Sequence, residues 1–149
     1  MLLKGDYFDG RFSHPSLSQA QEKVLKKCPG DLSQTLWEAG VYYEHIEAVI
    51  QSAERGYETW RKLSFEERIG YLKKYQEIVR SKKDEIAMAL ALEVGKPLWE
   101  AKTEAAALDS KVSVTITDSY ERIKTETIKD VMPKIDGHTI YRPLGPSLS

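Results

Sequence analysis

The segment 93–102 most constrains how this chain can fold, because it ends one helix and begins another within ten residues. Gly95 suits the left-handed position just past a helix end, where a Cβ would be strained. Pro97 suits the first turn of the next helix, since its missing N–H would have no intrahelical partner there. The spacing therefore predicts two helices joined by a tight turn.

Three further patterns predict helices earlier in the chain. Apolar residues recur at every third or fourth position across 43–62, which is typical of one buried helix face. Ser64 and Ser81 are each followed three positions later by an acidic residue, the pattern of a capped helix start. We therefore expect a second helix to begin at Ser64 and a third at Ser81.

The fourth predicted helix contains a conflict between two local signals. The run 112–117 alternates between β-branched and polar residues, which by itself favours a strand. The helical stripe nevertheless continues through this run from Ala101 to Ile123. We therefore predict one uninterrupted helix.

Strands are expected only near the two ends of the chain. At the start, Gly5-Asp6 and Asp9-Gly10 are turn signals of a small hairpin. Residues 13–33 are expected to be mostly loop, and residues 34–39 one more strand. Near the end, Asp136-Gly137 is expected to turn a hairpin between 127–134 and 138–144. The predicted fold class is mainly α with small β-hairpins.

Composition narrows the function classes without naming one. The chain has 149 residues, a formal net charge of −1 and 30% charged residues, so no nucleic acid or membrane partner is predicted. Its single cysteine, Cys28, excludes an internal disulfide and fits a reducing cytoplasm. No apolar run is long enough for a membrane span, and the N-terminus has no signal-peptide pattern.

Motif reading alone defines no enzyme activity. The chain has no glycine-rich nucleotide motif, and its three histidines are dispersed, so no metal site is predicted. Glu100 and Glu104 are one helical turn apart, but nearby lysines favour a solvated ion-pair surface over acid–base catalysis. Lys111 lies two turns further along the same face, where it either binds an anionic ligand or is simply exposed to solvent. The three tryptophans, Trp37, Trp60 and Trp99, are expected to pack in the core.

A series of motifs extends over nearly the whole chain. They are, in order, Trp60-Arg61-x-Leu63-Ser64-x-Glu66-x-Arg68, Glu93-x-Gly95-Lys96-Pro97, Glu100-Ala101-x-Thr103-Glu104 and Tyr141-Arg142-Pro143-x-Gly145. This series resembles the N-terminal part of the NAD(P)-dependent aldehyde dehydrogenases. The motifs at 63–68 and 99–104, with the segment around Lys111, are most similar to succinylglutamate semialdehyde dehydrogenases.

The resemblance implies a fold and its parts. The chain would be an N-terminal fragment of the aldehyde dehydrogenase α/β fold, without a complete Rossmann sheet. Residues 1–40 would form an N-terminal hairpin and loop region. Residues 41–125 would form four helices at the periphery of the cofactor domain, and residues 126–149 the start of the oligomerisation hairpin. The three parts are expected to make one compact unit.

The resemblance also implies which functional residues to expect. In the family, the catalytic cysteine, the general-base glutamate, the oxyanion-hole asparagine and the cofactor motifs all follow the part that is similar here. Cys28 does not match the nucleophile. We therefore expect no catalytic, cofactor-binding or metal-binding residue in this chain, whereas the full-length family uses NAD or NADP. One helix face would line the substrate tunnel through Thr103, Ala107 and Lys111, with Lys111 holding an anionic substrate.

Two hypotheses about function follow. In the first, the chain is a truncated aldehyde dehydrogenase of arginine catabolism in the cytoplasm, inactive alone and dependent on the missing C-terminal portion. In the second, it is a non-enzymatic helical module that self-associates as a homo-oligomer or binds a partner. Helices that expose an apolar face, and a strand that exposes an open edge, support the second.

Overall fold

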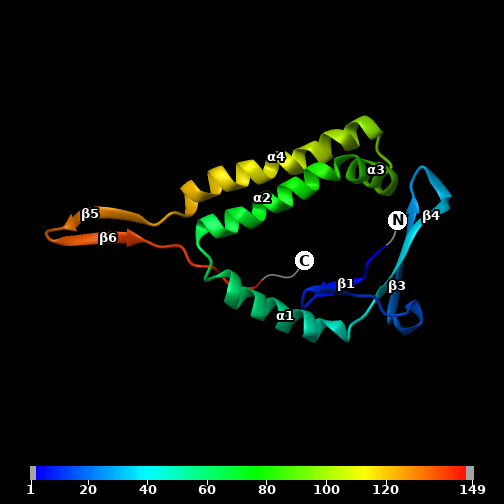
Figure 1. Cartoon of the computed structure of the whole chain (residues 1–149), viewed down its shortest axis with the longest axis horizontal. Helices are drawn as coiled ribbons and strands as arrows, with labels where there is room; N and C mark the ends of the chain where they lie inside the picture. The colour runs from blue at the N-terminus through cyan, green and yellow to red at the C-terminus, as the bar shows by residue number, and fades with distance from the viewer. Residues whose placement is uncertain (1–2, 147–149) are drawn as a thin grey trace.

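Helices form the middle of the chain and short antiparallel hairpins form its two ends (Figure 1). The structure is a computed structural model that describes residues 3–146. Its elements in chain order are β1 Asp6–Phe8, β2 Arg11–Ser13, η1 Leu17–Gln19, β3 Glu22–Cys28, β4 Asp31–Val41, α1 His45–Trp60, α2 Phe65–Ser81, α3 Lys83–Val94, α4 Leu98–Ile123, β5 Glu126–Met132 and β6 Ile135–Thr139. Within this described part the strands pair only two by two, so there is no doubly wound sheet.

Small residues let α3 and α4 approach closely and form the centre of the core. Ala87 of α3 and Ala101 and Ala105 of α4 are fully buried. Ile86, Leu90 and Ala91 pack around them. Because an alanine side chain is one methyl group, the two helix backbones lie near each other and leave little room for a larger residue.

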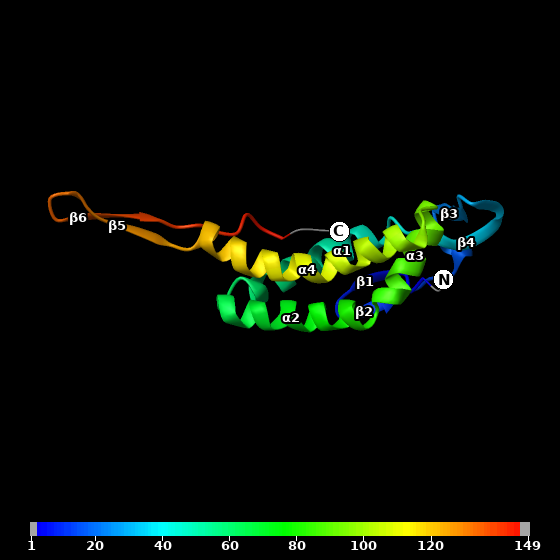
Figure 2. The ribbon, with the colours of Figure 1, turned by 90° about the horizontal axis from the view of Figure 1, so that it is seen from above.

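Polar contacts fix α2 along α4, beyond the part of α4 that packs on α3, and Figures 1 and 2 show α2 and α4 side by side. The Arg80 guanidinium donates to both carboxylate oxygens of Asp109 at 3.1 and 3.0 Å. The Gln76 amide donates to the Asp109 carbonyl and to the Ser113 hydroxyl, each at 2.9 Å. These contacts set the register of α2 on α4.

The helix boundaries confirm the predictions made from Ser64, Gly95 and Pro97. The Ser64 hydroxyl accepts the Glu67 N–H at 3.1 Å, and the Glu67 carboxylate accepts the Ser64 N–H at 2.7 Å. Gly95 has a φ of 75° and ends α3, and Pro97 directly precedes α4. The prediction for Ser81 is wrong. Its hydroxyl donates back to the Ile78 carbonyl at 2.8 Å, so it ends α2 and does not cap α3.

The long helix α4 passes through the β-branched run 112–117 without a break, as predicted. Its apolar stripe decides the outcome, since Val112 is buried on the same side as Ala101 and Ala105. A strand at this place would turn alternate side chains away from that core. Among residues 3–146, no helix is both long enough and apolar enough to cross a membrane.

The N-terminal strands differ from the sequence prediction in two places. The first hairpin turns at Asp9-Gly10 alone, and Gly5 lies before β1 with its backbone close to Ser13. Residues 13–33 are not mostly loop, because β3 pairs with the extended β4 around a turn at Pro29-Gly30. The expected strand at 34–39 is the middle of β4. Strand β3, the partner of β4, was not predicted because its three lysines interrupt the apolar pattern of the sequence.

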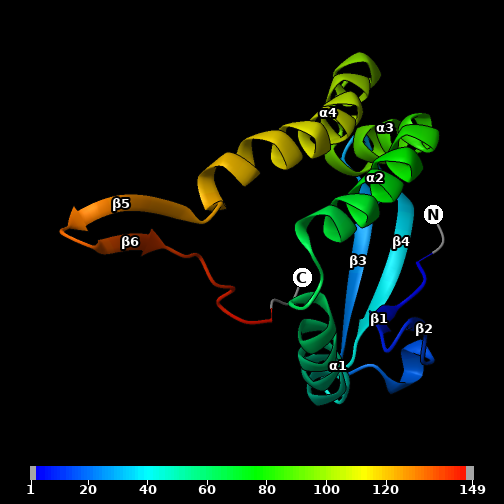
Figure 3. The same cartoon turned by 60° about the vertical axis from the view of Figure 1, so that its left-hand side comes forward.

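The C-terminal hairpin also turns at a different place than predicted. Asp136 and Gly137 lie inside β6, and the chain reverses at Pro133-Lys134, where Lys134 has a φ of 66°. The Asp136 carboxylate accepts the Asp130 N–H at 3.1 Å and an ammonium hydrogen of Lys129. These bonds hold Asp136 against an irregularity in β5 and not at a turn. The hairpin extends beyond the helices (Figure 3).

Polar contacts connect the N-terminal hairpins to the helices, among them the His45 ring at the start of α1, which lies 2.7 Å from the Asp6 carboxylate of β1. The Trp37 indole N–H of β4 donates to the Glu93 carboxylate of α3 at 2.8 Å. On the other side, the Asp9 N–H donates to the Ser52 hydroxyl at 2.9 Å, and Arg55 pairs with the Asp9 carboxylate at 2.5 Å. The contact of Trp37 with Glu93 places the β3–β4 turn beside the α3–α4 turn, where Gly95 meets the Pro29 ring.

Candidate functional site

The beginning of α4 carries a cluster of one lysine and two carboxylates. The Lys96 ammonium lies 2.5 Å from the Glu104 carboxylate and 3.7 Å from that of Glu100. The Lys96 side chain is only 17% exposed, whereas both glutamates are about half exposed. The cluster therefore joins the α3–α4 turn to two turns of α4. It agrees with the ion-pair interpretation of this surface and shows no free carboxylate pair for acid–base chemistry.

The pKa of Lys96 is raised, chiefly because its ammonium donates a hydrogen bond to Glu104. Partial burial opposes this effect, and the negative charges of Glu104 and Glu100 add to it. A raised folded-state pKa means that the pair stabilises the fold fully below the unfolded lysine pKa of about 10.4. That stabilisation disappears as pH rises through the folded-state value.

We expect a Glu104→Gln variant to be less stable than the unmodified chain by the same amount from pH 6 to pH 9. The difference should shrink only as pH rises above the unfolded lysine pKa of about 10.4 and through the raised folded-state pKa of Lys96. Urea unfolding at a series of pH values measures it. An Asp118→Asn variant is a control for charge removal alone, because Asp118 is exposed far along α4 and belongs to none of the ion pairs of residues 3–146. A Glu104→Gln difference that grows at high pH contradicts the assignment.

The predicted tunnel residues share one exposed face of α4. Thr103, Ala107 and Lys111 are four residues apart, so they form a stripe about 12 Å long on the helix surface. The Thr103 hydroxyl donates to the Trp99 carbonyl at 3.2 Å. All three side chains are exposed, and within residues 3–146 Lys111 has no ion-pair partner. This face can hold an anionic group at Lys111, and it supplies no nucleophile beside a base.

The prediction that the tryptophans pack in the core is wrong for two of the three. Trp99 is 72% exposed and Trp60 is 41% exposed. Trp37 is partly buried and donates its N–H to Glu93. Trp60 is the last residue of α1 and Trp99 lies in the first turn of α4, and both side chains remain exposed there.

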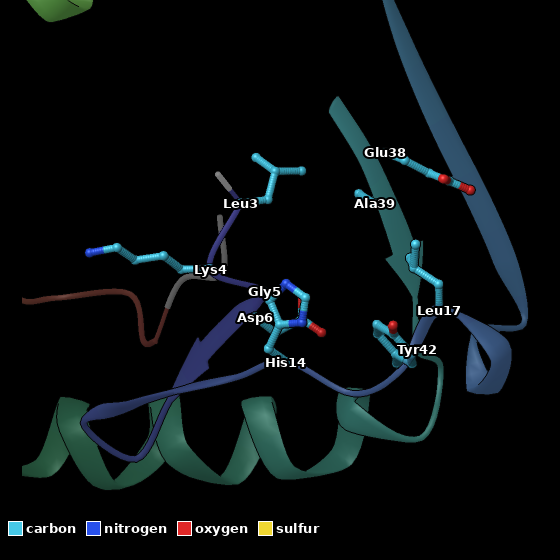
Figure 4. A pocket seen from close by; sticks show the side chains of 10 residues that line it. Leu3, Lys4, Gly5, Asp6, His14, Leu17, Glu38, Ala39 and Tyr42 are labelled. Carbon is cyan, nitrogen blue, oxygen red and sulfur yellow. The ribbon is translucent and has the colours of Figure 1, made fainter. Parts of the chain in front are cut away.

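A cavity of about 220 Å³ lies between the N-terminal segment, η1 and the end of β4. Figure 4 shows Leu3, His14, Leu17 and Tyr42 around it and Lys4 directed away from it. Tyr42 is buried and its hydroxyl donates to the Pro15 carbonyl at 3.0 Å. No site residue predicted from sequence lies here. Sequence spacing gives no signal for it, because three separate segments build its walls.

The described residues do not fit a dinucleotide or a metal ion. A dinucleotide site needs a parallel strand that leads through a glycine-rich turn into a helix start, which holds the pyrophosphate. Every strand pair among residues 3–146 is antiparallel, and no described strand leads through a glycine-rich turn into the start of a helix. No group of three or more His, Cys, Asp or Glu side chains among residues 3–146 is arranged for a metal ion.

The chain matches a protein-family model and curated proteins of the same family. The model of the aldehyde dehydrogenase family matches residues 17–149. N-succinylglutamate 5-semialdehyde dehydrogenase of Vibrio cholerae is 34% identical over 105 residues, which are 68% of this chain and 21% of that protein. The enzyme of the same name from Chromohalobacter salexigens is 36% identical over 90 residues, 60% of this chain and 18% of that protein.

Solved structures also match the fold of this chain. An NADP-dependent enzyme of E. coli matches with a TM-score of 0.69 and 25% identity, over 84% of this chain and 25% of that one. An NAD-dependent aldehyde dehydrogenase from Sinorhizobium meliloti matches with a TM-score of 0.73 and 18% identity, over 88% and 26%. The chain thus spans about a fifth of the length of these curated relatives and a quarter of these structures.

Proposed function

Because the chain belongs to the aldehyde dehydrogenase family, we propose that it supplies the N-terminal portion of an enzyme that oxidises a semialdehyde with NAD or NADP. The observation that carries the proposal is the family match over 17–149 together with relatives named for N-succinylglutamate 5-semialdehyde. The proposed substrate class is a semialdehyde that also bears a carboxylate, and the proposed location is the cytoplasm.

The chain alone is proposed to be inactive and to bind no cofactor. Attack on an aldehyde needs an activated nucleophile, and the resulting oxyanion needs preorganised donors. Cys28, the one thiol of the sequence, is buried at the end of β3 and far along the chain from α4. The parts 1–40, 41–125 and 126–149 are proposed as one unit that contributes a tunnel wall and an oligomerisation hairpin.

Turnover and cofactor binding by the 149-residue chain test this proposal. NADH or NADPH formation is followed with a panel of carboxylated and uncharged semialdehydes, and cofactor binding is followed by calorimetry. We expect neither turnover nor binding. Turnover that survives repurification and follows the concentration of the chain would contradict the proposal.

Lys111 is proposed to bind the carboxylate of the substrate. We consider a chimera in which residues 17–149 replace the corresponding N-terminal region of the Vibrio cholerae relative. In it, Lys111→Ala should raise KM for a carboxylated semialdehyde about tenfold, the effect of losing one charge-assisted hydrogen bond. KM for an uncharged aldehyde of equal length should not change. Lys102→Ala serves as the matched control, and an unchanged KM for the carboxylated substrate contradicts this role.

A self-associating module is the second candidate function. Exposed apolar side chains occur along α2 and on the β5–β6 hairpin, for example Ile128, Met132 and Ile135. Both outer edges of that hairpin are unpaired among residues 3–146. Light scattering across a concentration series tests this candidate. A particle mass that stays at one chain up to high concentration excludes it.

A further inference from the structure

The cavity of about 220 Å³ near the N-terminus is large enough for a small organic ligand. A cavity of about 150 Å³ already holds a molecule of the size of benzene. Figure 4 shows its walls, which come from residues 3–6, His14, Leu17, residues 38–40 and Tyr42. The wall at 3–14 precedes the region that the family model matches, so the family match does not describe a complete cavity.

The Tyr42 ring is a fixed part of this wall. Tyr42 is 7% exposed, and its hydroxyl donates to the Pro15 carbonyl at 3.0 Å. A Cβ on Gly40 would collide with the Tyr42 ring, so glycine at this position lets the ring lie against the backbone of β4. An aromatic ring held in this way offers a surface that attracts a cation placed over its face.

Negative charge outweighs positive charge around the cavity. Asp6 and Glu38 both line it, and Glu38 belongs to none of the ion pairs of residues 3–146. One Asp6 oxygen lies 2.7 Å from the His45 ring, which leaves the second oxygen as an acceptor. Lys4 is directed away from the cavity in Figure 4, and its ammonium lies 5.3 Å from the centre of the Phe12 ring.

The rest of the wall is mostly hydrocarbon. Leu3, Leu17 and Ala39 contribute apolar side chains. The His14 ring also lines the cavity, and a neutral imidazole has one nitrogen that accepts a hydrogen bond. The wall therefore combines apolar surface with carboxylate and imidazole acceptors.

We infer that this cavity binds a small organic cation, an ammonium group carried by a short hydrocarbon chain. The ammonium is placed between the Glu38 carboxylate and the Tyr42 ring, where it makes a charge-assisted hydrogen bond and a cation–π contact. The hydrocarbon chain packs on Leu3 and Leu17. An anion of the same size would instead face two carboxylates, and a neutral alcohol would make only the weaker, uncharged hydrogen bond.

The inference does not rest on the proposed function. The cavity shares no residue with the stripe of Thr103, Ala107 and Lys111 on α4, which is proposed to bind an anionic substrate. Activity of a reconstituted enzyme therefore neither supports nor contradicts it, and its test is ligand binding alone.

Titration of the 149-residue chain with three ligands of equal chain length tests the inference. The ligands are n-pentylammonium, n-pentanol and pentanoate, and binding is followed by two-dimensional NMR at pH 8, where imidazole groups are ordinarily neutral. We expect n-pentylammonium to bind with a dissociation constant of about 1 mM, at least tenfold more tightly than the other two. The shifted amide signals should be those of Leu17, Ala39 and Gly40.

A pair of variants tests the role of the carboxylate. Glu38→Gln should weaken the binding of n-pentylammonium at least tenfold and should change the weak binding of n-pentanol less than twofold. Glu54→Gln is the matched control, because Glu54 is exposed on α1, lies outside the cavity and belongs to none of the ion pairs of residues 3–146. It should change the binding of n-pentylammonium less than twofold.

Intermolecular NOEs in the unmodified chain give a readout that depends on no variant. The methyl protons of n-pentylammonium should show NOEs to the Leu17 methyl groups. Equal affinity for the ammonium and the alcohol overturns the inference, because the cavity is then merely apolar. Tighter binding of pentanoate, no saturable binding of the ammonium, or an unchanged affinity in Glu38→Gln also overturns it.

Discussion

An Ala105→Leu variant is expected to lose about 3 kcal/mol of folding stability, the upper part of the range for overpacking a tight core. Ala105 is fully buried where α4 crosses α3, and Ala87 and Ala101 are buried beside it. Leucine adds three carbon atoms to a place that now holds one methyl group. The helices must separate to admit them, and the neighbouring Leu90 then loses part of its packing.

The matched control is Ala107→Leu, the same change two residues along the same helix. Ala107 is exposed, so the larger side chain points into solvent and stability should change by less than about 0.5 kcal/mol. Urea unfolding followed by circular dichroism measures both variants. Equal losses at the two positions would show that helix propensity, and not the α3–α4 contact, sets the cost.

A Gly95→Ala variant should be destabilised by about 1–3 kcal/mol, because two effects act in the same direction. Gly95 has a φ of 75°, a left-handed conformation that a Cβ disfavours. The new Cβ would also lie 2.9 Å from the Cβ of Pro29, at the turn between β3 and β4. The substitution therefore strains the α3–α4 turn and pushes away the hairpin that covers it.

Gly70→Ala provides the opposite expectation within the same chain. Gly70 lies inside α2, and a Cβ there meets nothing within 4 Å. Alanine is favoured over glycine in a helix interior by about 1 kcal/mol, so this variant should be more stable. Thermal unfolding of both proteins decides the matter. A stabilised Gly95→Ala variant would contradict the turn geometry described here.

The sequence predicted the helical part well because its signals are local. Gly95 and Ser64 act through their own backbone conformation and a hydrogen bond three residues away, and both were placed correctly. The turns were harder to predict. Asp136 was expected at a turn, but its carboxylate bonds the backbone of Asp130, a partner that spacing does not reveal. Strand β3 was missed because its apolar residues are interrupted by lysines and its stability comes from β4.

The candidate site could be predicted only in part. The Thr103, Ala107 and Lys111 stripe follows from helical spacing, and its role in binding stays a prediction. The exposure of Trp60 and Trp99 could not be predicted, since an apolar residue at helical spacing indicates burial whether or not the covering element is present.

Reconstitution of activity tests the central claim most directly. The 149-residue chain and the following portion of the Vibrio cholerae relative are assayed separately and after co-expression, with N-succinylglutamate semialdehyde and NAD. The account predicts NADH formation by the co-expressed pair and none by either polypeptide alone. Turnover by the chain alone, or a stable one-to-one complex with no turnover, would contradict it.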